Sequence, residues 1–562
     1  MRNGGKLLVD SLVALGARKA FGVPGESYLA ALDALYDTAG TLDFVMCRNE
    51  GGAGLMAAAW GKLTGQPGIC MVTRGPGATN ASIGVHTAMQ DSAPMLMFVG
   101  QVGTGMKGRE AFQELDYKAV FGSMAKWAVE IDQVERLPEI LSRAWTVATS
   151  GRPGPVVIAL PEDMLATATT MPALTGPVEV SEPAPAPGSM ARLRQMLAGA
   201  QRPLILYGGC NWQAGSMALV QAFAEASDIP VVSVFRYQDM YDNTLPTFCG
   251  EAGVGMMPAV KALLREADVI LAINNRFGEN STDGYTLFNT PQPQRKIIHV
   301  HGSDLEIGKI YRPALGIHAG PNAFAAELGA LAPVRGNWAA WRAEGRAAYE
   351  AGFDLPDLPS AVDMGKVCAH LRQVLPEDMI LTNGAGNFTV WPNKFFKFGP
   401  KARLLAPQSG AMGYGLCAAI AAKVAEPDRT VVCFAGDGDF QMNCTELATA
   451  LQAGSQPIVL ILNNGIYGTI RAHQERNYPA RVSGTTMTQN PDFVMLAQAY
   501  GFHAERVDST EAFPAAFERA LASKTGAVLE LAISAEAVTP RQTLSQMREA
   551  ALNGADLANA AT

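Results

Sequence analysis

Short apolar runs alternate with helix-length segments along the whole chain, and this alternation limits the fold more than any other feature of the sequence. Runs such as GICMVT, PMLMFVG and PVVIAL have the length and composition of buried strands. Strands that are separated by helices are joined by crossovers, which give parallel sheets covered by helices. The sequence therefore predicts an α/β protein with doubly wound, mostly parallel sheets.

The strand-like runs form three sets, which predicts three domains. The second set runs from PLILYGG to KIIHVHG, and the third runs from MILTNGAG through TVVCFAG and PIVLILNN to AVLELAIS. A proline-rich stretch and a charged helical passage separate the sets and are typical of linkers. The predicted parts are a first domain at 1–170, a linker at 171–190, a middle domain at 191–335, a linker at 336–360, a third domain at 361–540 and a C-terminal tail at 541–562 that starts as a helix.

Composition and charge exclude several classes of protein. Hydrophobic residues make up 48% of the chain and charged residues 17%, as in compact globular proteins. The net charge is −8 without any basic block, so nucleic acid is not an expected partner. We find neither a signal peptide nor a run close to the roughly 18–20 apolar residues of a membrane span. The eight cysteines include no C-x-x-C pair, so we expect buried thiols and a cytoplasmic location.

Two polar turns follow neighbouring strand-like runs of the third set. Asp437 follows TVVCFAG and stands between two glycines, and Asn464 ends PIVLILNN. Both turns should lie at the carboxyl ends of parallel strands, where open α/β sheets bind ligands. A carboxylate, an amide oxygen and a nearby backbone carbonyl are hard ligands of the kind that Mg²⁺ prefers, and glycines let the backbone approach a bulky anion. The span predicts a diphosphate held through a divalent metal ion.

This G-D-G…N-N pattern, with its strand context, resembles the signature of thiamine-diphosphate enzymes. The resemblance implies that Asp437, Asn464 and the main-chain oxygen of Ile466 hold Mg²⁺. It also implies that the three domains are a pyrimidine-binding, a middle and a diphosphate-binding domain. The cofactor-binding residues that it assigns to these turns are Gly436, Asp437, Gly438, Asn464, Ile466 and Tyr467.

Glu50, in CRNEGGAG, is the candidate for activating the cofactor. From the local residues alone, an acid that stabilises the start of a helix is the favoured interpretation. The resemblance implies instead that the Glu50 carboxyl hydrogen-bonds the pyrimidine ring of the cofactor and makes an amino group on that ring basic. Because RGPGATN follows at the expected place, Pro76 and Asn80 are implied as cofactor-binding residues, and so is Gly25 in FGVPGES.

Two segments of the third set carry further candidates. QSGAMGYG resembles the segment in which a bulky apolar side chain, here Met412, holds the cofactor in a bent shape. From the residues alone, Met412 would be a core residue, since methionine fills gaps. NGAGNFTVW resembles a diphosphate-binding turn, which implies that Gly386, Asn387 and Phe388 bind the cofactor.

RGPGATNASIGVHTAMQDSAP and GREAFQELD resemble segments of acetolactate synthases. The resemblance implies that a 2-oxoacid is decarboxylated and a carbon–carbon bond is then formed through an enamine intermediate, with Phe112 and Gln113 as catalytic residues. Without the resemblance, AFQELD would be interpreted as an exposed helix. The alternative function is that of a non-ligating decarboxylase that releases an aldehyde, although the histidine pairs of simple decarboxylases have no obvious match.

Two departures from the acetolactate synthase pattern bear on the substrate. In RFGEN, Asn280 replaces an arginine of the family, and His473 replaces a tryptophan. The acceptor is therefore left open, and FAD is uncertain. The resemblance implies thiamine diphosphate and Mg²⁺ as cofactors, a small-molecule 2-oxoacid as substrate, and at least a homodimer in which Glu50 serves the cofactor of the partner chain; neither nucleic acid nor a membrane is an expected partner.

Overall fold

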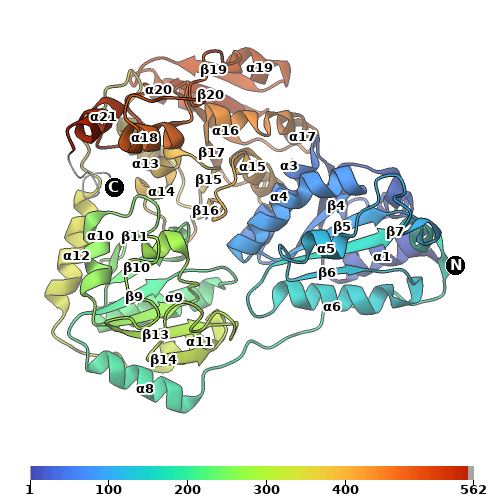
Figure 1. The fold of residues 1–562 in the computed structure, drawn as a ribbon, viewed down its shortest axis with the longest axis horizontal. Coiled ribbons are helices and arrows are strands. Elements are labelled where there is room, and N and C mark those ends of the chain that lie inside the picture. Colours follow the sequence, from blue (N-terminus) through green and yellow to red (C-terminus); the bar gives the residue numbers. More distant parts are fainter. Residues whose placement is uncertain (1, 555–562) are drawn as a thin grey trace. The chain divides into compact units, whose positions relative to one another are not determined.

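Three six-stranded parallel sheets form the framework of the computed structural model, which describes residues 2–554 (Figure 1). Helices flank each sheet, so the predicted α/β class with three doubly wound, parallel sheets is confirmed. The N-terminal sheet has the order β3-β2-β4-β5-β7-β6. Its strands are β3 (Asp43–Met46), β2 (Lys19–Gly22), β4 (Gly68–Val72), β5 (Met95–Gln101), β7 (Pro155–Pro161) and β6 (Trp127–Glu130).

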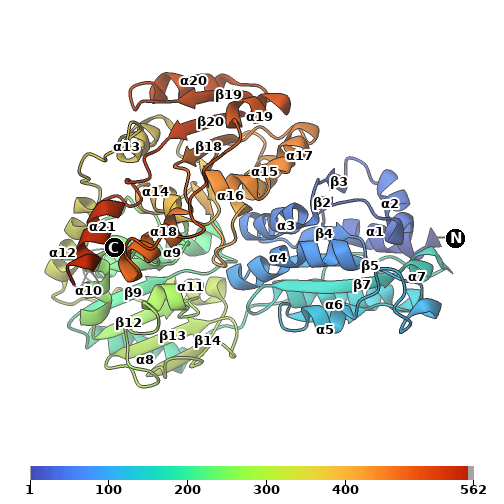
Figure 2. The ribbon, with the colours of Figure 1, turned by 45° about the horizontal axis from the view of Figure 1, so that its top comes forward.

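Helices cover both faces of the N-terminal sheet. Helices α1 (Gly4–Ala14), α2 (Leu29–Tyr36) and α6 (Leu137–Thr149) share one apolar core with the strands. Helices α3 (Glu50–Thr64) and α4 (Gly75–Asp91) pack against each other on the opposite face from α6 (Figure 2). A Cβ atom on Gly84 would lie 2.4 Å from the Cα of Gly54, so only glycine permits this crossing.

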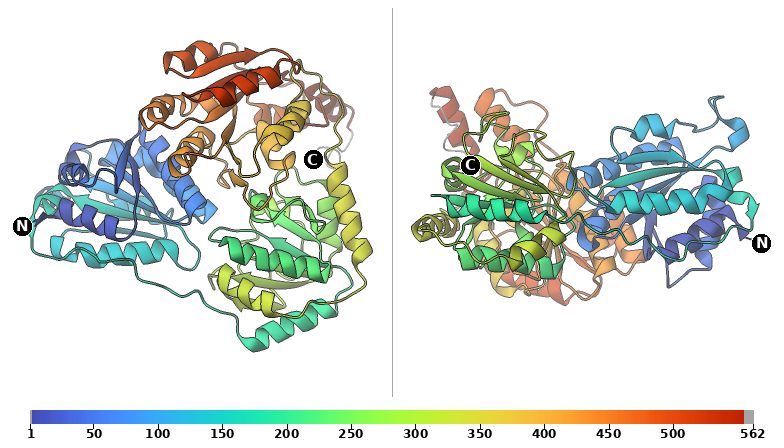
Figure 3. Two further views of the ribbon diagram at one scale, coloured as in Figure 1. Left: turned by 180° about the vertical axis from the view of Figure 1, so that it is seen from behind. Right: turned by 90° about the horizontal axis from the view of Figure 1, so that it is seen from below.

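The middle sheet has the order β11-β10-β9-β12-β13-β14. Helix α12 (Ala339–Ala351), which falls inside the stretch predicted as the second linker, packs beside β11 at the sheet's edge (Figure 3). The strands are β11 (Phe248–Ala252), β10 (Val231–Val234), β9 (Pro203–Tyr207), β12 (Val269–Ile273), β13 (Lys296–His301) and β14 (Leu315–His318), and the other helices are α8 (Pro187–Ala198), α9 (Ala214–Ser227), α10 (Pro258–Glu266) and α11 (Pro321–Ala330).

The C-terminal sheet has the order β16-β15-β17-β18-β20-β19. Its strands are β16 (Arg403–Leu405), β15 (Ile380–Asn383), β17 (Val431–Gly436), β18 (Ile458–Asn463), β20 (Ala527–Ala532) and β19 (His503–Val507). Around it lie α13 (Met364–Val374), α14 (Val390–Lys394), α16 (Asp437–Gln441), α18 (Gly468–Asn477), α19 (Phe493–Ala499) and α20 (Phe513–Ala522).

The predicted tail at 541–562 begins with a helix, as expected, namely α21 (Leu544–Leu552). This helix packs on α18, where the Arg548 guanidinium donates hydrogen bonds of 2.7 and 2.5 Å to the Glu475 carboxylate. These bonds, more than any other influence, lower the pKa of Glu475 to about 2. The last residues of the predicted tail, 555–562, lie outside the described residues.

The chain is organised as two compact units, each built from discontinuous segments. The described residues of one unit are 2–181, 407–428 and 441–457, and those of the other are 182–406, 429–440 and 458–554. The first unit holds the N-terminal sheet together with α15 (Tyr414–Ala425), which packs on α3, and α17 (Leu447–Gln452). The second unit holds the middle and C-terminal sheets. The domain boundaries named above stay a prediction.

The cysteines and the lengths of the helices bear on two expectations from the sequence. None of the eight cysteines, all of which lie within residues 2–554, forms a disulfide, and seven of them are buried. The expectation of buried thiols is therefore confirmed for all but Cys444, which is partly exposed. Over the same residues, every helix is too short or too polar to span a bilayer.

Candidate active site

The two polar turns predicted from the sequence lie side by side in the second unit. Strands β17 and β18 are parallel neighbours, and Asp437 and Asn464 are the first residues after them. The backbone N–H of Gly465 donates a 2.9 Å hydrogen bond to Oδ2 of Asp437, which ties the two turns together. Asp437 is buried, and its burial raises the pKa of the carboxyl above its ordinary value. The parallel pairing thus brings both predicted side chains to one edge of the sheet.

The turn after β18 carries two of the predicted oxygen donors, the Asn464 side chain and the carbonyl of Ile466. The backbone N–H of Ile466 donates to Oδ1 of Asn464 at 3.2 Å, so Ile466 folds back over the Asn464 side chain. One carboxylate, one amide oxygen and one main-chain carbonyl are hard donors that suit Mg²⁺. Among the described residues no group of three or more His, Cys, Asp or Glu side chains is placed to hold a metal. The predicted set of Mg²⁺ ligands contains only one acidic side chain, Asp437. Its other two donors are an amide oxygen and a main-chain carbonyl oxygen, which also fit Mg²⁺.

A third turn, at Gly386–Phe388, packs against the turn that contains Asp437. Gly386 has a φ of +145°, which glycine alone adopts without strain, and a Cβ there would lie 2.8 Å from the Phe388 ring. A Cβ on Gly436 would lie 2.9 Å from the same ring. The amide of Asn387 donates to the carbonyl of Val538 at 3.0 Å. The structure therefore brings these predicted residues together, with the Phe388 ring packed against the glycines of both turns.

Tyr467 lies over the same turn. Its ring is 2.6 Å from the position of a Cβ on Gly438, so no side chain would fit at that glycine. The backbone N–H of Tyr467 donates to the carbonyl of Thr485 at 2.9 Å, which fixes the residue between the turn that contains Asn464 and the start of α18.

Two residues that the sequence analysis missed complete this part of the site. The Nδ2 of Asn490 donates to Oδ2 of Asp437 at 2.8 Å and to Oδ1 of Asn463 at 3.1 Å. Oδ1 of Asp439 accepts a 3.0 Å hydrogen bond from the backbone N–H of Ala385. Asp439 could have been noticed as the second acid of GDGD, whereas nothing in the sequence around Asn490 points to Asp437.

The first unit assembles the residues predicted around Glu50. Glu50 is the first residue of α3, and its Oε2 accepts a 3.0 Å hydrogen bond from the amide of Asn80 on α4. Its Oε1 lies 3.3 Å from the position of a Cβ on Gly77, so the start of α4 packs close to the carboxylate, and Pro76 is the exposed residue just before Gly77. A Cβ on Gly25 would lie 2.6 Å from the side chain of Thr73, the residue after β4. These candidates therefore share one edge of the N-terminal sheet.

The other predicted residues of the first unit are less enclosed. The backbone N–H of Gly75 donates to the carbonyl of Gln113 at 2.9 Å, so the segment containing Phe112 is anchored at the start of α4. Phe112 itself is 72% exposed, and no helix forms at residues 111–115. Met412 is partly exposed and lies just before α15, the helix that packs on α3. Their roles stay predictions.

Glu446 is a buried acid that the sequence analysis did not identify, and it holds the chain just before Glu50. Its carboxylate accepts hydrogen bonds from the backbone N–H groups of Arg48 and Asn49, at 3.2 and 2.9 Å, and from the hydroxyl of Thr449 at 2.5 Å. Burial raises the pKa of Glu446. Because it binds two backbone groups at the entry to α3, Glu446 is a positioning residue for Glu50.

We expect Glu446→Ala to lower the free energy of unfolding by roughly 2–4 kcal/mol, because it leaves buried donors unpaired. Denaturant unfolding followed by circular dichroism measures this change. Gln452→Ala is the matched control, since Gln452 binds the Arg48 guanidinium at 2.8 Å on the exposed side. Equal, small effects of both substitutions would contradict the positioning role.

Comparisons with known proteins show the family of the chain. Three family models match the chain: the N-terminal TPP binding domain of thiamine pyrophosphate enzymes at residues 2–120, their central domain at 190–328 and their C-terminal TPP binding domain at 384–531.

Curated relatives match almost the whole chain. The acetolactate synthase isozyme 2 large subunit of Escherichia coli is 32% identical over 94% of this chain and 95% of the relative. A probable acetolactate synthase large subunit of Methanocaldococcus jannaschii is 31% identical over 96% and 93%, and the mitochondrial acetolactate synthase catalytic subunit of Saccharomyces cerevisiae is 30% identical over 94% and 80%. The resemblance inferred from the sequence is confirmed. The chain belongs to the thiamine pyrophosphate enzyme family.

Proposed function

We propose that this enzyme decarboxylates a 2-oxoacid and joins the remaining fragment to a second carbonyl compound, as the name acetolactate synthase implies for its relatives. The observation that carries the proposal is the near-full-length similarity to several acetolactate synthases at 30–32% identity. The paired turns at Asp437 and Asn464 support it, because their oxygen donors fit the ion that would anchor a diphosphate.

Each predicted residue has a proposed task. Asp437, Asn464 and the carbonyl of Ile466 would hold Mg²⁺, and the Glu50 carboxyl would hydrogen-bond the pyrimidine ring of the cofactor and make an amino group on that ring basic. When bound, thiamine diphosphate supplies the electron sink for loss of CO₂. The residues that line the cofactor are proposed to be Gly25, Pro76, Asn80, Gly386, Asn387, Phe388, Met412, Gly436, Gly438 and Tyr467, with Phe112 and Gln113 on the substrate side.

We propose that the active enzyme is at least a homodimer, in which Glu50 of one chain serves the cofactor of its partner. The names of two relatives as large subunits support an assembly of several chains. Binding of Mg²⁺ at Asp437, Asn464 and Ile466 is likewise proposed. A yellow colour with a flavin absorption spectrum in the purified protein would establish FAD, and colourless protein would exclude tightly bound FAD.

Incubation with pyruvate, thiamine diphosphate and Mg²⁺ is expected to yield acetolactate. Acid treatment converts acetolactate to acetoin, which a colorimetric assay detects, and an alcohol dehydrogenase assay detects acetaldehyde in the same sample. Acetaldehyde alone would favour the simple decarboxylase. Asn280 replaces an arginine of the family, so the acceptor is left open. The assay therefore also includes 2-oxobutanoate and benzaldehyde as acceptors. Absence of every ligation product with any of these acceptors would contradict the carboligase proposal.

A further inference from the structure

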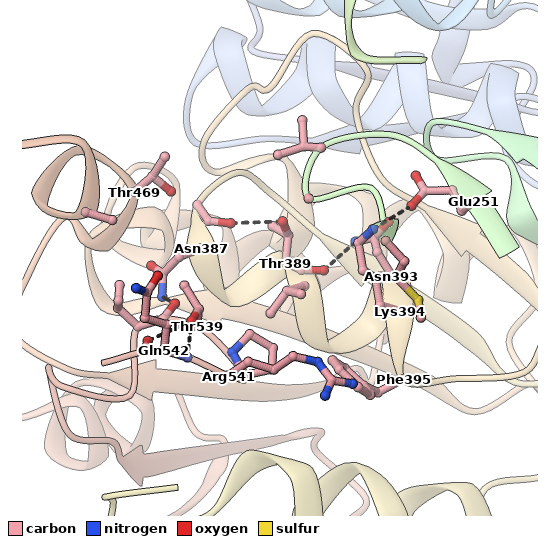
Figure 4. Close-up of a pocket in the computed structure, with 18 of the residues that line it drawn as sticks. Glu251, Asn387, Thr389, Asn393, Lys394, Phe395, Thr469, Thr539, Arg541 and Gln542 are labelled. Atoms are coloured by element: carbon pink, nitrogen blue, oxygen red, sulfur yellow. Dashed lines mark hydrogen bonds and ion pairs between the residues drawn. The ribbon is translucent and has the colours of Figure 1, made fainter. Parts of the chain in front are cut away.

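The second unit contains a cavity of about 360 Å³ beside the predicted diphosphate turn (Figure 4). Gly386 and Asn387 form part of its wall, together with α14, α18 and the segment 538–542. The volume falls within the range of small-molecule sites. Much of the wall is apolar, from Phe235, Val254, Met257, Val390, Phe395 and Val538.

The charged groups on this wall are mainly cationic. Lys394, Arg476 and Arg541 line the cavity, and Glu251 is the one carboxylate among the described residues that do so. Figure 4 shows Glu251 and Lys394 facing each other, with Nζ 3.4 Å from Oε2. Glu251 is therefore already paired with Lys394, and the two arginines remain as the excess positive charge.

The two arginines differ in what they already bind. Nη2 of Arg541 donates to the carbonyl of Gly352 at 2.9 Å. Nε of Arg476 is buried without a hydrogen-bond partner, and within residues 2–554 Arg476 makes no ion pair. Its sequence neighbour Glu475 is already bound by Arg471 and Arg548. Burial also lowers the pKa of Arg476 below its ordinary value.

We propose that the cavity binds a carboxylate with a bulky apolar body, and that Arg476 holds the carboxylate group. A guanidinium presents parallel N–H groups that match a carboxylate, and an apolar body suits the rest of the wall. The inference rests on the proposed function for one step: the ligand is a 2-oxoacid whose side chain is larger than methyl. His473, which also lines the cavity, lies one turn before Arg476 on α18.

Binding of 3-phenylpropanoate tests the inference without any turnover, because this acid has no keto group. Calorimetry on the wild-type enzyme with thiamine diphosphate and Mg²⁺ is expected to show binding that 3-phenylpropan-1-ol does not match. Arg476→Gln should weaken binding of the acid by about ten- to a hundredfold, and Arg476→Lys by less. Arg481→Gln is the control, since Arg481 is exposed and does not line the cavity. Thermal unfolding checks that all variants are folded.

The outcomes separate the inference from the proposed function. Binding that depends on Arg476, without turnover of any 2-oxoacid, supports the inference in its general form and removes the proposed function. Turnover of a 2-oxoacid with unchanged KM and unchanged 3-phenylpropanoate affinity in Arg476→Gln overturns the inference and leaves the function intact. Equal binding of acid and alcohol, no binding of either, or a loss confined to Arg541→Gln also overturns it.

Discussion

Replacement of Glu50 by glutamine is expected to lower turnover by about 10²- to 10⁴-fold while the enzyme still binds thiamine diphosphate. Glutamine has the shape of glutamate and can still accept the 3.0 Å hydrogen bond from Asn80, but it cannot exchange a proton with the cofactor. The measurement is the rate of 2-oxoacid consumption at saturating cofactor, with calorimetry to confirm that the cofactor is bound.

The control for this substitution must match the position of Glu50 at the start of a helix. Glu139 lies in the first turn of α6, and its side chain is 67% exposed. Glu139→Gln therefore loses the same favourable interaction with the helix dipole but has no proposed role in catalysis. If both variants kept full activity, Glu50 would be only a helix-start acid, which is the interpretation that its local sequence favours.

The sequence predicted most of the strands that are buried on both faces, although it missed the inner strand β2, with the sequence KAFG. Runs such as GICMVT and PMLMFVG correspond to β4 and β5, whose residues are all buried. The strands that it missed include β6, with the sequence WAVE, and β19, with HAERV. Both lie at the edges of their sheets and are partly exposed. An edge strand needs no continuous apolar run, so local hydrophobicity does not reveal it.

The candidate site was predictable where its residues lie within a recognisable sequence motif. Asp437 and Asn464 each end a strand-like run, and parallel pairing of these runs brings them together. Asn490 and Glu446 were not predictable in this way. Each binds a group that is distant in the sequence, Asn490 through a loop and Glu446 across almost 400 positions to Asn49. Such contacts depend on the three-dimensional packing of the unit, about which a local pattern carries no information.

The second large effect is expected for Asp437→Asn, which should weaken Mg²⁺-dependent binding of thiamine diphosphate by about a hundredfold or more. Loss of outer-shell partners of a metal site already costs 10- to 100-fold in affinity, and Asp437 is the proposed ligand itself. Asparagine keeps an acceptor oxygen for the backbone N–H of Gly465, so the turn should persist. Titration of the cofactor at fixed Mg²⁺, followed by calorimetry, measures the change, and circular dichroism verifies the fold.

Asp508→Asn provides the comparison at the same edge of the same sheet. Asp508 follows β19, which runs parallel to β20 as β17 does to β18, so both aspartates stand at carboxyl ends of strands. The Asp508 side chain is 67% exposed and pairs with Arg506 on the surface, so its loss should leave cofactor affinity unchanged. If Asp437→Asn bound thiamine diphosphate as tightly as Asp508→Asn, Asp437 would only join the turns after β17 and β18, and the metal would have to be held elsewhere.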